Sequence, residues 1–319
     1  MKIMVTGGAG YIGSHVVLDL CEAGNEVIVL DDLSTGNREA VDSRAEFIQG
    51  STLNNDDLAK TLNGVEAVVH LAAFKAAGES MIEPGKYSNN NISGTISLLN
   101  AMIDHDVDKF IFSSTAAVYG YPQYLPLDEN HPVEPINYYG FTKLEIERIL
   151  KWYSELKGLK FAALRYFNAA GYDPKGRLTS LEKNPANLLP IAMEVASGIR
   201  DKMQVFGDDY DTPDGTGVRD YIHVSDLASA HVKAIEYLNH NESITVNLAT
   251  GDRHSVLDVI NLTKEISGRE ITYEVVARRP GDPAELYAGT TMAFDQLGWK
   301  AKYSDLKTLL ETTWKVYQK

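Results

Sequence analysis

Ile3-Met4-Val5-Thr6-Gly7-Gly8-Ala9-Gly10-Tyr11-Ile12-Gly13 is a short apolar run that passes directly into a glycine-rich turn. The residues that follow have helical apolar spacing to about Gly24, and a second apolar run over 27–30 ends at Asp31. This order predicts a strand, a tight turn, a helix and a parallel strand. Glycines at 7, 10 and 13 permit the turn, a close approach to a pyrophosphate and tight packing of the helix. The amide groups at the start of the helix favour an anion there.

Asp31 stands where a dinucleotide site needs an acid, at the end of the second strand. Its carboxylate would accept hydrogen bonds from both hydroxyls of an adenosine ribose. Asp31 and Asp32 together would repel a 2′-phosphate, so the pair favours NAD over NADP. The alternative is an ordinary turn or helix-cap acid. The placement of the acid after a glycine turn and a second strand favours the cofactor role.

Further apolar runs predict strands over 46–49, 67–71, 109–112 and 160–165, each separated from the next by a helical pattern. Six strands alternating with helices indicate an α/β fold with a doubly wound, mostly parallel Rossmann sheet. Beyond Asn168 the pattern becomes irregular, with long loops. We therefore expect a cofactor domain over 1–168 and a smaller mixed α/β substrate domain over 169–319, with segments near 220–250 packing back onto the first domain.

Tyr139 and Lys143 lie four residues apart in a helical segment, so they share one face of the helix. The same spacing recurs at Tyr153/Lys157 and Tyr303/Lys307, where an ordinary surface contact is the simpler interpretation. Tyr139 differs because a strand ending in Ser113-Ser114-Thr115 lies 24 residues upstream. A phenol, an ammonium and a hydroxyl at the end of a strand can remove a proton from a hydroxyl while a hydride leaves the same carbon.

For tyrosine to act as a base near neutral pH, its pKa must fall by roughly 3 units from ~10, which corresponds to about 4 kcal/mol. An ammonium ~5 Å away at an effective dielectric of ~20 supplies about 3.3 kcal/mol. We therefore expect Lys143 to lower the pKa of Tyr139, and the positive charge of an oxidised nicotinamide to supply the remainder.

Other polar residues follow the ends of expected strands. Ala72 and Lys75 come after the fourth strand, and Asn90 lies in the helical segment after Pro84. Lys75 would reach the cofactor or a substrate phosphate, unless it is a solvated loop lysine. In the second half, Arg219 and Arg279 are the candidates for binding a diphosphate, because a guanidinium binds phosphate bidentately.

Composition limits the possible partners. A net charge of −14 argues against nucleic acid or an anionic membrane as a partner, and no apolar run reaches the roughly 20 residues of a membrane span. The N-terminus has no signal-peptide pattern, and the single cysteine, Cys21, fits a reducing cytoplasm. No Cys/His cluster has the spacing of a metal site.

Six motifs occur in order over nearly the whole chain: Thr6 to His15, Phe74 to Ser80, Ser113-Ser114-Thr115, Tyr139-x-x-x-Lys143, Arg165 to Asn168, and Gly215 to Val224. In these motifs the sequence closely resembles the UDP-glucose 4-epimerase family, part of the extended short-chain dehydrogenases/reductases. The 215–224 stretch is the most specific, since many relatives share the glycine turn and the Tyr/Lys pair. The resemblance implies a tightly held NAD that oxidises C4 of a UDP-hexose and returns the hydride to the opposite face.

The resemblance also implies roles for individual residues. Tyr139 would be the base and acid, Thr115 the hydrogen-bond partner of O4, and Lys143 the ribose anchor. The implied cofactor contacts are Gly7, Gly10, Tyr11, Ile12, Gly13, Asp31, Asp32, Ser51, Ala72, Lys75, Asn90, Ser113, Tyr139, Lys143 and Tyr166. The implied substrate contacts are Lys75, Thr115, Tyr139, Asn168, Asn187, Leu188, Arg219, Arg279, Asp282 and Leu286.

Three positions depart from the family pattern. Thr115 replaces a frequent serine and keeps the hydroxyl. Ser51 replaces an aspartate that contacts the adenine amino group, which lowers the expected affinity for the cofactor. Leu286 replaces a tyrosine found in members restricted to UDP-glucose and UDP-galactose. The smaller side chain leaves room for an N-acetyl group and adds UDP-N-acetylhexosamines to the expected substrates.

Two other functions compete with epimerisation. A sugar-nucleotide dehydratase typically has Asp-Glu directly after the catalytic threonine, whereas Ala116-Ala117 follow Thr115 here. A non-catalytic dinucleotide sensor could lose the Tyr/Lys pair, and this chain keeps it. The resemblance further implies a homodimer formed through two helices of the first domain.

Overall fold

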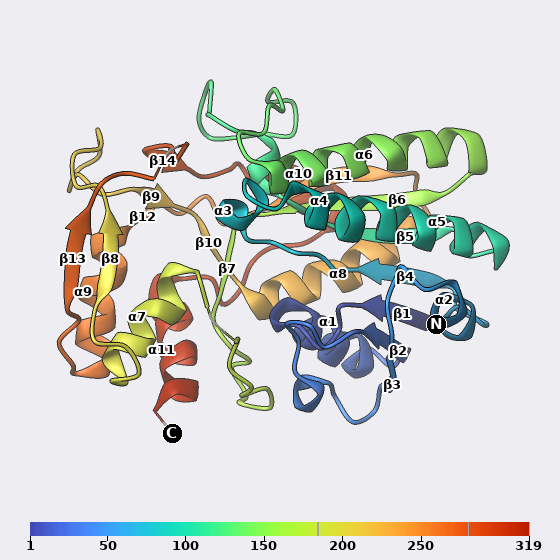
Figure 1. Ribbon diagram of the computed structural model, residues 1–319, viewed down its shortest axis with the longest axis horizontal. Coiled ribbons are helices and arrows are strands. Elements are labelled where there is room, and N and C mark those ends of the chain that lie inside the picture. Colours follow the sequence, from blue (N-terminus) through green and yellow to red (C-terminus); the bar gives the residue numbers. More distant parts are fainter. Residues whose placement is uncertain (184, 280, 319) are drawn as a thin grey trace.

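A large parallel sheet with helices on both faces forms most of the molecule (Figure 1). The computed structural model describes residues 1–183, 185–279 and 281–318. The strand order is β11-β6-β5-β4-β1-β2-β3, and every neighbouring pair is parallel. The strands are β1 (Lys2–Thr6), β2 (Glu26–Asp31), β3 (Glu46–Gln49), β4 (Ala67–His70), β5 (Lys109–Thr115), β6 (Lys160–Tyr166) and β11 (Ile244–Leu248). The expected doubly wound sheet is confirmed.

The sheet contains one strand more than the six that we expected from the first half of the chain. The seventh, β11, comes from the second half and pairs with β6, with Val246 opposite Leu164. The side chains of Val246 and Leu248 are fully buried. This burial explains why a strand so late in the chain joins the first sheet.

Alternate residues of the central strands bury opposite faces of the sheet. In β1, Ile3 and Val5 belong to one core cluster, whereas Met4 belongs to another. Side chains of a strand alternate between faces, and both faces of a parallel sheet are covered by helices, which explains the continuous apolar runs in the sequence. The helices on the first face are α1 (Tyr11–Glu22), α8 (Val224–Leu238) and α10 (Thr291–Leu297). Those on the second face are α2 (Asn55–Thr61), α5 (Gly94–Asp104) and α6 (Tyr138–Lys157).

The helical segment after Pro84 is not one regular helix as its sequence predicts. It consists of α4 (Pro84–Tyr87), a π-helical stretch (Ser88–Ser93) and α5. π-helical insertions often occur at functional sites, and this one includes Asn90. The other short helices are α3 (Ala77–Ser80) and two 3₁₀ turns, at Arg38–Ala40 and Ala116–Val118.

A second cluster of helices lies to the left of the large sheet in Figure 1. It contains α7 (Leu188–Ala196), α9 (Val256–Ser267), α11 (Leu306–Tyr317) and the parallel pair β8 (Met203–Phe206) and β13 (Tyr273–Val276). Very short strands connect this part to the large sheet: β7 (Asn168–Ala170), β9 (Val218–Arg219), β10 (Tyr221–His223), β12 (His254–Ser255) and β14 (Glu285–Leu286). Strands of two or three residues are too short to leave a periodic signal in the sequence.

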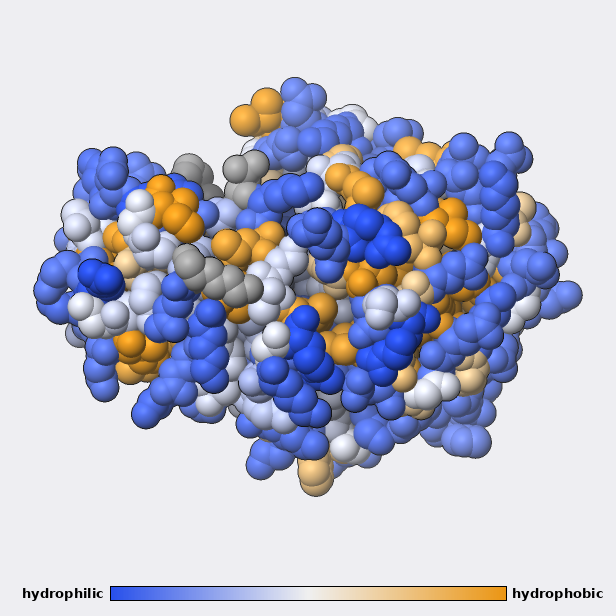
Figure 2. All heavy atoms as spheres, turned by 90° about the horizontal axis from the view of Figure 1, so that it is seen from below, coloured by the Kyte–Doolittle hydropathy of each residue, from blue (hydrophilic) through white to orange (hydrophobic). Residues whose placement is uncertain are grey.

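Polar side chains dominate the face shown in Figure 2, with apolar side chains scattered among them. This agrees with the acidic composition of the chain. Within the described ranges, none of the helices has the length and apolar character needed to cross a bilayer.

Candidate active site

The glycine turn between β1 and α1 has the shape of a dinucleotide cradle. Gly7 has a φ of +71°, and a Cβ atom there would lie 2.6 Å from the backbone nitrogen of Ala72. A Cβ atom on Gly13 would lie 2.1 Å from the carbonyl oxygen of Gly7. Side chains at either position would therefore clash with the backbone. Gly10, Tyr11 and Ile12 complete the turn and begin α1, whose N-terminal amides face the space that a pyrophosphate would take.

Asp31 lies beside this turn, as expected. Its carboxylate accepts hydrogen bonds from the backbone N–H of Ala9 at 2.9 Å and of Leu33 at 2.8 Å. Burial raises the pKa of Asp31, and these two hydrogen bonds oppose that rise. The neighbouring Asp32 is exposed and accepts a hydrogen bond from the N–H of Ser34 at 2.8 Å. The turn therefore requires glycine at positions 7 and 13, and an acid stands at the end of β2. Both features fit NAD.

Ser51 follows β3 at the same edge of the sheet. Its hydroxyl accepts a hydrogen bond from the N–H of Leu53 at 3.2 Å, and its own N–H donates to the carboxylate of Asp57 at 3.1 Å. The sequence analysis did not identify Asp57. A carboxylate is therefore present beside Ser51, although it comes from α2 instead of from position 51.

The segment after β4 carries Ala72, Lys75 and Asn90. The ammonium group of Lys75 forms an ion pair with Glu182, which belongs to the loop between β7 and α7. The amide of Asn90 donates to the side chain of Asn91 at 3.1 Å. Asn91 is buried and makes both backbone hydrogen bonds to Phe74 at 2.9 and 3.0 Å, so it holds this loop in place. Asn91 is a second residue that the sequence analysis missed.

Thr115, Tyr139 and Lys143 come together where β5 ends and α6 begins. The side chain of Asn137 caps α6 by accepting a hydrogen bond from the N–H of Gly140 at 2.8 Å. The ammonium nitrogen of Lys143 lies 5.9 Å from the centre of the Tyr139 ring and donates to the carbonyl oxygen of Ser113 at 2.7 Å. The three groups therefore have the arrangement expected from their spacing.

The electrostatics of this group differ from the expectation. Burial raises the pKa of Tyr139 to about 12, and a hydrogen bond with the Thr115 side chain opposes part of that rise. Burial also lowers the pKa of Lys143 to about 7. In the protein by itself, loss of water around the two side chains outweighs the attraction that we expected between phenolate and ammonium. A positive charge close to Tyr139 would lower this pKa toward neutral pH.

Tyr166 ends β6 and lies opposite Thr115 in the β5–β6 register. Its hydroxyl shares a hydrogen bond of 2.5 Å with Nε2 of His231. Burial raises the pKa of Tyr166, and a hydrogen bond with the Ser113 side chain opposes part of that rise. Burial lowers the pKa of His231 to about 4, so its ring is neutral near pH 7. His231 lies in α8, far from the motifs in sequence, which explains why sequence analysis did not connect it with the site.

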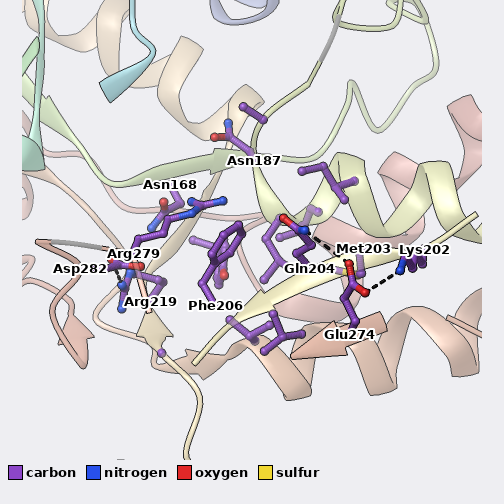
Figure 3. A pocket seen from close by; sticks show the side chains of 18 of the residues that line it. Asn168, Asn187, Lys202, Met203, Gln204, Phe206, Arg219, Glu274, Arg279 and Asp282 are labelled. Carbon is purple, nitrogen blue, oxygen red and sulfur yellow. Dashed lines mark hydrogen bonds and ion pairs between the residues drawn. The ribbon is translucent and has the colours of Figure 1, made fainter. Parts of the chain in front are cut away.

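A cavity of about 580 Å³ lies between β7 and β8 (Figure 3). Six of the expected substrate residues line it: Asn168, Asn187, Leu188, Arg219, Arg279 and Asp282. Arg219 forms an ion pair with Asp282, and the guanidinium carbon of Arg279 lies 3.7 Å from the centre of the Phe206 ring. Phe206 was not identified from sequence. The cavity therefore contains two arginines and an aromatic ring, which suit a diphosphate and a nucleobase.

The other expected substrate residues do not line this cavity in the described structure: Lys75, Thr115, Tyr139 and Leu286. Leu286 is opposite Arg219 in the β9–β14 pair, and it packs against a cluster that contains Ala116 and Leu144. Leu286 therefore lies between the cavity and the segment that follows Thr115.

Within residues 1–183, 185–279 and 281–318, no cluster of three or more His, Cys, Asp or Glu side chains is arranged to hold a metal ion. The chemistry that the described geometry supports is proton transfer by Tyr139 beside a dinucleotide cradle.

Comparison with known proteins identifies the family. Residues 3–249 match the model of the NAD dependent epimerase/dehydratase family. The UDP-glucose 4-epimerase of Lacticaseibacillus casei is 45% identical over 317 residues, which cover 98% of this chain and 96% of that protein.

Two solved structures are similar over nearly their whole length. The UDP-glucose 4-epimerase from Brucella ovis in complex with NAD has a TM-score of 0.96 at 43% identity, covering 99% of this chain and 98% of that one. The enzyme from Stenotrophomonas maltophila, with bound NAD and formylated UDP-arabinopyranose, has a TM-score of 0.96 at 40% identity, covering 100% and 98%. The resemblance inferred from the motifs is confirmed, and the chain belongs to the NAD dependent epimerase/dehydratase family.

Proposed function

We propose that this protein interconverts UDP-galactose and UDP-glucose, with NAD as a bound cofactor. The observation that carries the proposal is the meeting of Thr115, Tyr139 and Lys143 at the carboxyl end of β5, at the same edge of the parallel sheet as the glycine turn after β1. The phenolate form of Tyr139 takes the proton from the 4-hydroxyl of the sugar and becomes the phenol, which later returns that proton to O4, while the Thr115 hydroxyl orients O4. NAD, when bound, supplies the hydride acceptor and donor for C4.

The cofactor contacts follow from the cradle. Gly7, Gly10 and Gly13 let the backbone approach the pyrophosphate, and the start of α1 provides amide donors. Asp31 accepts the ribose hydroxyls at the adenosine end, and Lys143 holds the other ribose. The negative charges of Asp31 and Asp32 exclude a 2′-phosphate. Together these contacts select NAD and place it next to Tyr139.

The cavity between β7 and β8 holds the UDP part of the substrate in this proposal. Arg219 and Arg279 bind the diphosphate, and Asp282 exchanges its ion pair with Arg219 for contacts to the nucleoside. The sugar then extends toward Leu286 and Thr115. The enzymes from Stenotrophomonas maltophila and Bifidobacterium longum, solved with a UDP-sugar and with UDP respectively, support a UDP-containing substrate.

Product analysis by nuclear magnetic resonance tests this function directly. We expect the purified protein to convert UDP-galactose into UDP-glucose without net consumption of added NAD. Tyr139→Phe removes the phenolic oxygen and should lower kcat by about 10²- to 10⁴-fold. Tyr153→Phe is the matched control, because Tyr153 has the same spacing to a lysine but lies outside the site. Equal activity of the two variants would contradict the proposed role of Tyr139.

We also infer a homodimer formed through α5 and α6. The side chains of Trp152 and Leu156 on α6 are 60% and 67% exposed, and with Ile103 on α5 they line an apolar hollow. Large exposed apolar side chains on adjacent helices are typical of an interaction surface. Light scattering should give twice the chain mass for the native protein and the single mass for Trp152→Glu/Leu156→Glu. A native monomer would contradict this inference.

The cytoplasmic location stays a prediction. It is supported by Cys21, a buried free thiol. Cell fractionation followed by detection of the native protein would test it, and recovery in a secreted fraction would contradict it.

A further inference from the structure

Residues 113–115 of β5 contact residues in three successive turns of α6, and these three contacts together are called the ladder. Its three steps are the contacts of Thr115 with Tyr139, of the Ser113 carbonyl oxygen with Lys143, and of the Ser114 hydroxyl with Glu147. The Ser114 hydroxyl donates to Glu147 at 2.5 Å. The helix residues are spaced by four, so all three lie on one face of α6. The first two steps hold the proposed catalytic groups, and the third step has no role in the proposed chemistry.

Glu147 also forms a two-point ion pair with Arg165, which lies opposite Ser114 in the β5–β6 register. The guanidinium donates to the two carboxylate oxygens at 2.9 and 2.6 Å. The side chains of Arg165 and Glu147 are only 7% and 3% exposed. A buried ion pair stabilises a fold no better than well-packed apolar side chains do. Charges at this position therefore indicate a purpose other than stability.

Arg165 continues the network away from the site. Its guanidinium donates to the hydroxyl of Tyr119 at 2.9 Å, and that hydroxyl donates to the side chain of Asn247 in β11 at 2.6 Å. The ladder is thus held from three strands of the sheet. The orientation of α6 relative to β5 cannot change without breaking a buried charged contact.

We propose that Glu147 and Arg165 are positioning residues for the epimerisation. Glu147 fixes the register of β5 and α6 that brings Thr115 and Lys143 to Tyr139. Arg165 holds the carboxylate of Glu147 one helical turn from Lys143 and prevents the two from pairing. The proposal rests on the roles of Tyr139 and Lys143 proposed above.

The charges around Tyr139 and Lys143, here called the dyad, affect the pKa values of both side chains. The titratable groups that surround Lys143 come from three elements: His70 on β4, Tyr139 and Glu147 on α6, and Arg165 and Tyr166 on β6. Burial lowers the pKa of His70 to about 3, so its ring is neutral. Glu147 and Arg165 are the neighbours with opposite full charges. Because they cancel, the dyad experiences little net field from them.

Single substitutions of the two residues should move the pH profile of kcat/KM in opposite directions. Glu147→Gln leaves the positive charge of Arg165, which favours the phenolate of Tyr139 and shifts the acid limb to lower pH. Arg165→Met leaves the negative charge of Glu147 and shifts that limb to higher pH. Eight helical residues, the spacing from Tyr139 to Glu147, span ~12 Å, and a unit charge at that distance and an effective dielectric of ~20 moves a pKa by roughly 1 unit. The double variant should return the limb to its native position.

Leu150→Ala is the matched control for loss of stability. Leu150 is fully buried on the same helix and makes no contact in the ladder, so its truncation should lower the melting temperature without moving the pH profile. NAD affinity, followed by fluorescence, should stay within about threefold of the native value in all four variants: Glu147→Gln, Arg165→Met, their double variant and Leu150→Ala. Shifts in the same direction, or no shift in either single variant, would overturn the positioning role. Tyr139→Phe separates this failure from a failure of the proposed function. If neither single variant shifts the pH profile and Tyr139→Phe is inactive, only the positioning role is overturned. If Tyr139→Phe is also active, the catalytic roles of Tyr139 and Lys143 are overturned as well.

Discussion

The carboxylate of Asp31 accepts a hydrogen bond from the backbone N–H of Ala9 at 2.9 Å, so the acid proposed to select the cofactor also holds the glycine turn. Asp31→Ala should therefore destabilise the cofactor-free protein as well as weaken NAD binding. The loss of two charged hydrogen bonds in a buried position predicts about 2–4 kcal/mol less free energy of unfolding. Urea denaturation measures this change. Asp32→Ala, at an exposed position, should change it by no more than ~0.5 kcal/mol, and equal losses would contradict the argument.

The pKa of Tyr139 should depend on the redox state of the cofactor. It is raised to about 12 in the protein alone, and a nearby positive charge favours the phenolate and lowers it. We expect the NAD complex to titrate roughly 1–3 units below the NADH complex. Ultraviolet difference titration, with the spectrum of Tyr139→Phe subtracted, isolates this phenol. Equal pKa values in the two complexes would show that the cofactor charge does not activate Tyr139.

Introducing at position 51 the aspartate that the family resemblance implies should not by itself improve NAD binding. The N–H of Ser51 already donates to the carboxylate of Asp57 at 3.1 Å, so a second carboxylate in Ser51→Asp would be repelled. The double variant Ser51→Asp/Asp57→Asn removes that repulsion and should bind NAD up to about tenfold more tightly, equivalent to one charged hydrogen bond. Calorimetry measures both affinities. The gain should vanish with an analogue that has hypoxanthine in place of adenine; tighter binding by the single variant would contradict this account.

Leu286 should control the size of the accepted sugar. It is only partly buried, between Arg219 in the pair with β9 and the cluster around Ala116. We expect native protein to convert UDP-N-acetylgalactosamine as well as UDP-galactose. Leu286→Tyr should reduce kcat/KM for the N-acetylated substrate by about 10-fold or more while leaving UDP-galactose within threefold. Leu286→Met is the size-matched control. Native conversion of UDP-galactose alone would refute the pocket argument and leave the mechanism unaffected.

Stability should fall in mild acid because several histidines are buried as neutral rings. Burial lowers the pKa of His70 and His223 to about 3, and that of His15 and His231 to about 4. The unfolded chain binds more protons than the folded one below pH ~6.5, so stability is lost as the pH falls from there. Each ring should contribute about 2 kcal/mol of loss between pH 7 and 5. Thermal unfolding of His15→Leu should depend less steeply on pH in this range. His105→Leu, at an exposed residue, should follow the native slope.

Much of the cofactor half was predictable because its signals are local. The glycine turn, Asp31 and the helix with Tyr139 and Lys143 each combine a backbone requirement with a fixed spacing. Sequence periodicity likewise identified most strands of the large sheet. The interactions that sequence did not reveal are between residues distant along the chain. Examples are the ion pair of Lys75 with Glu182 and the hydrogen bond of Tyr166 with His231.

The expected effect of Lys143 on the pKa of Tyr139 does not hold in the protein alone, for a different reason, whereas the expected effect of the cofactor's charge stays a prediction. A spacing of four residues correctly brings Lys143 near Tyr139, but it does not report how much water surrounds them. Burial dominates both pKa values and drives each side chain toward its neutral form. Asp57 and Phe206 were missed because neither belongs to a recognisable motif.

The position of β11 has a consequence for how the protein is made. This strand covers the outer edge of β6 but begins at Ile244, nearly 80 residues after β6 ends at Tyr166. During synthesis, the outer backbone edge of β6 stays unpaired until the ribosome has synthesised the residues of β11. Unpaired strand edges recruit other chains, so this interval exposes the nascent protein to aggregation. A fragment that stops near residue 168 would retain that open edge permanently.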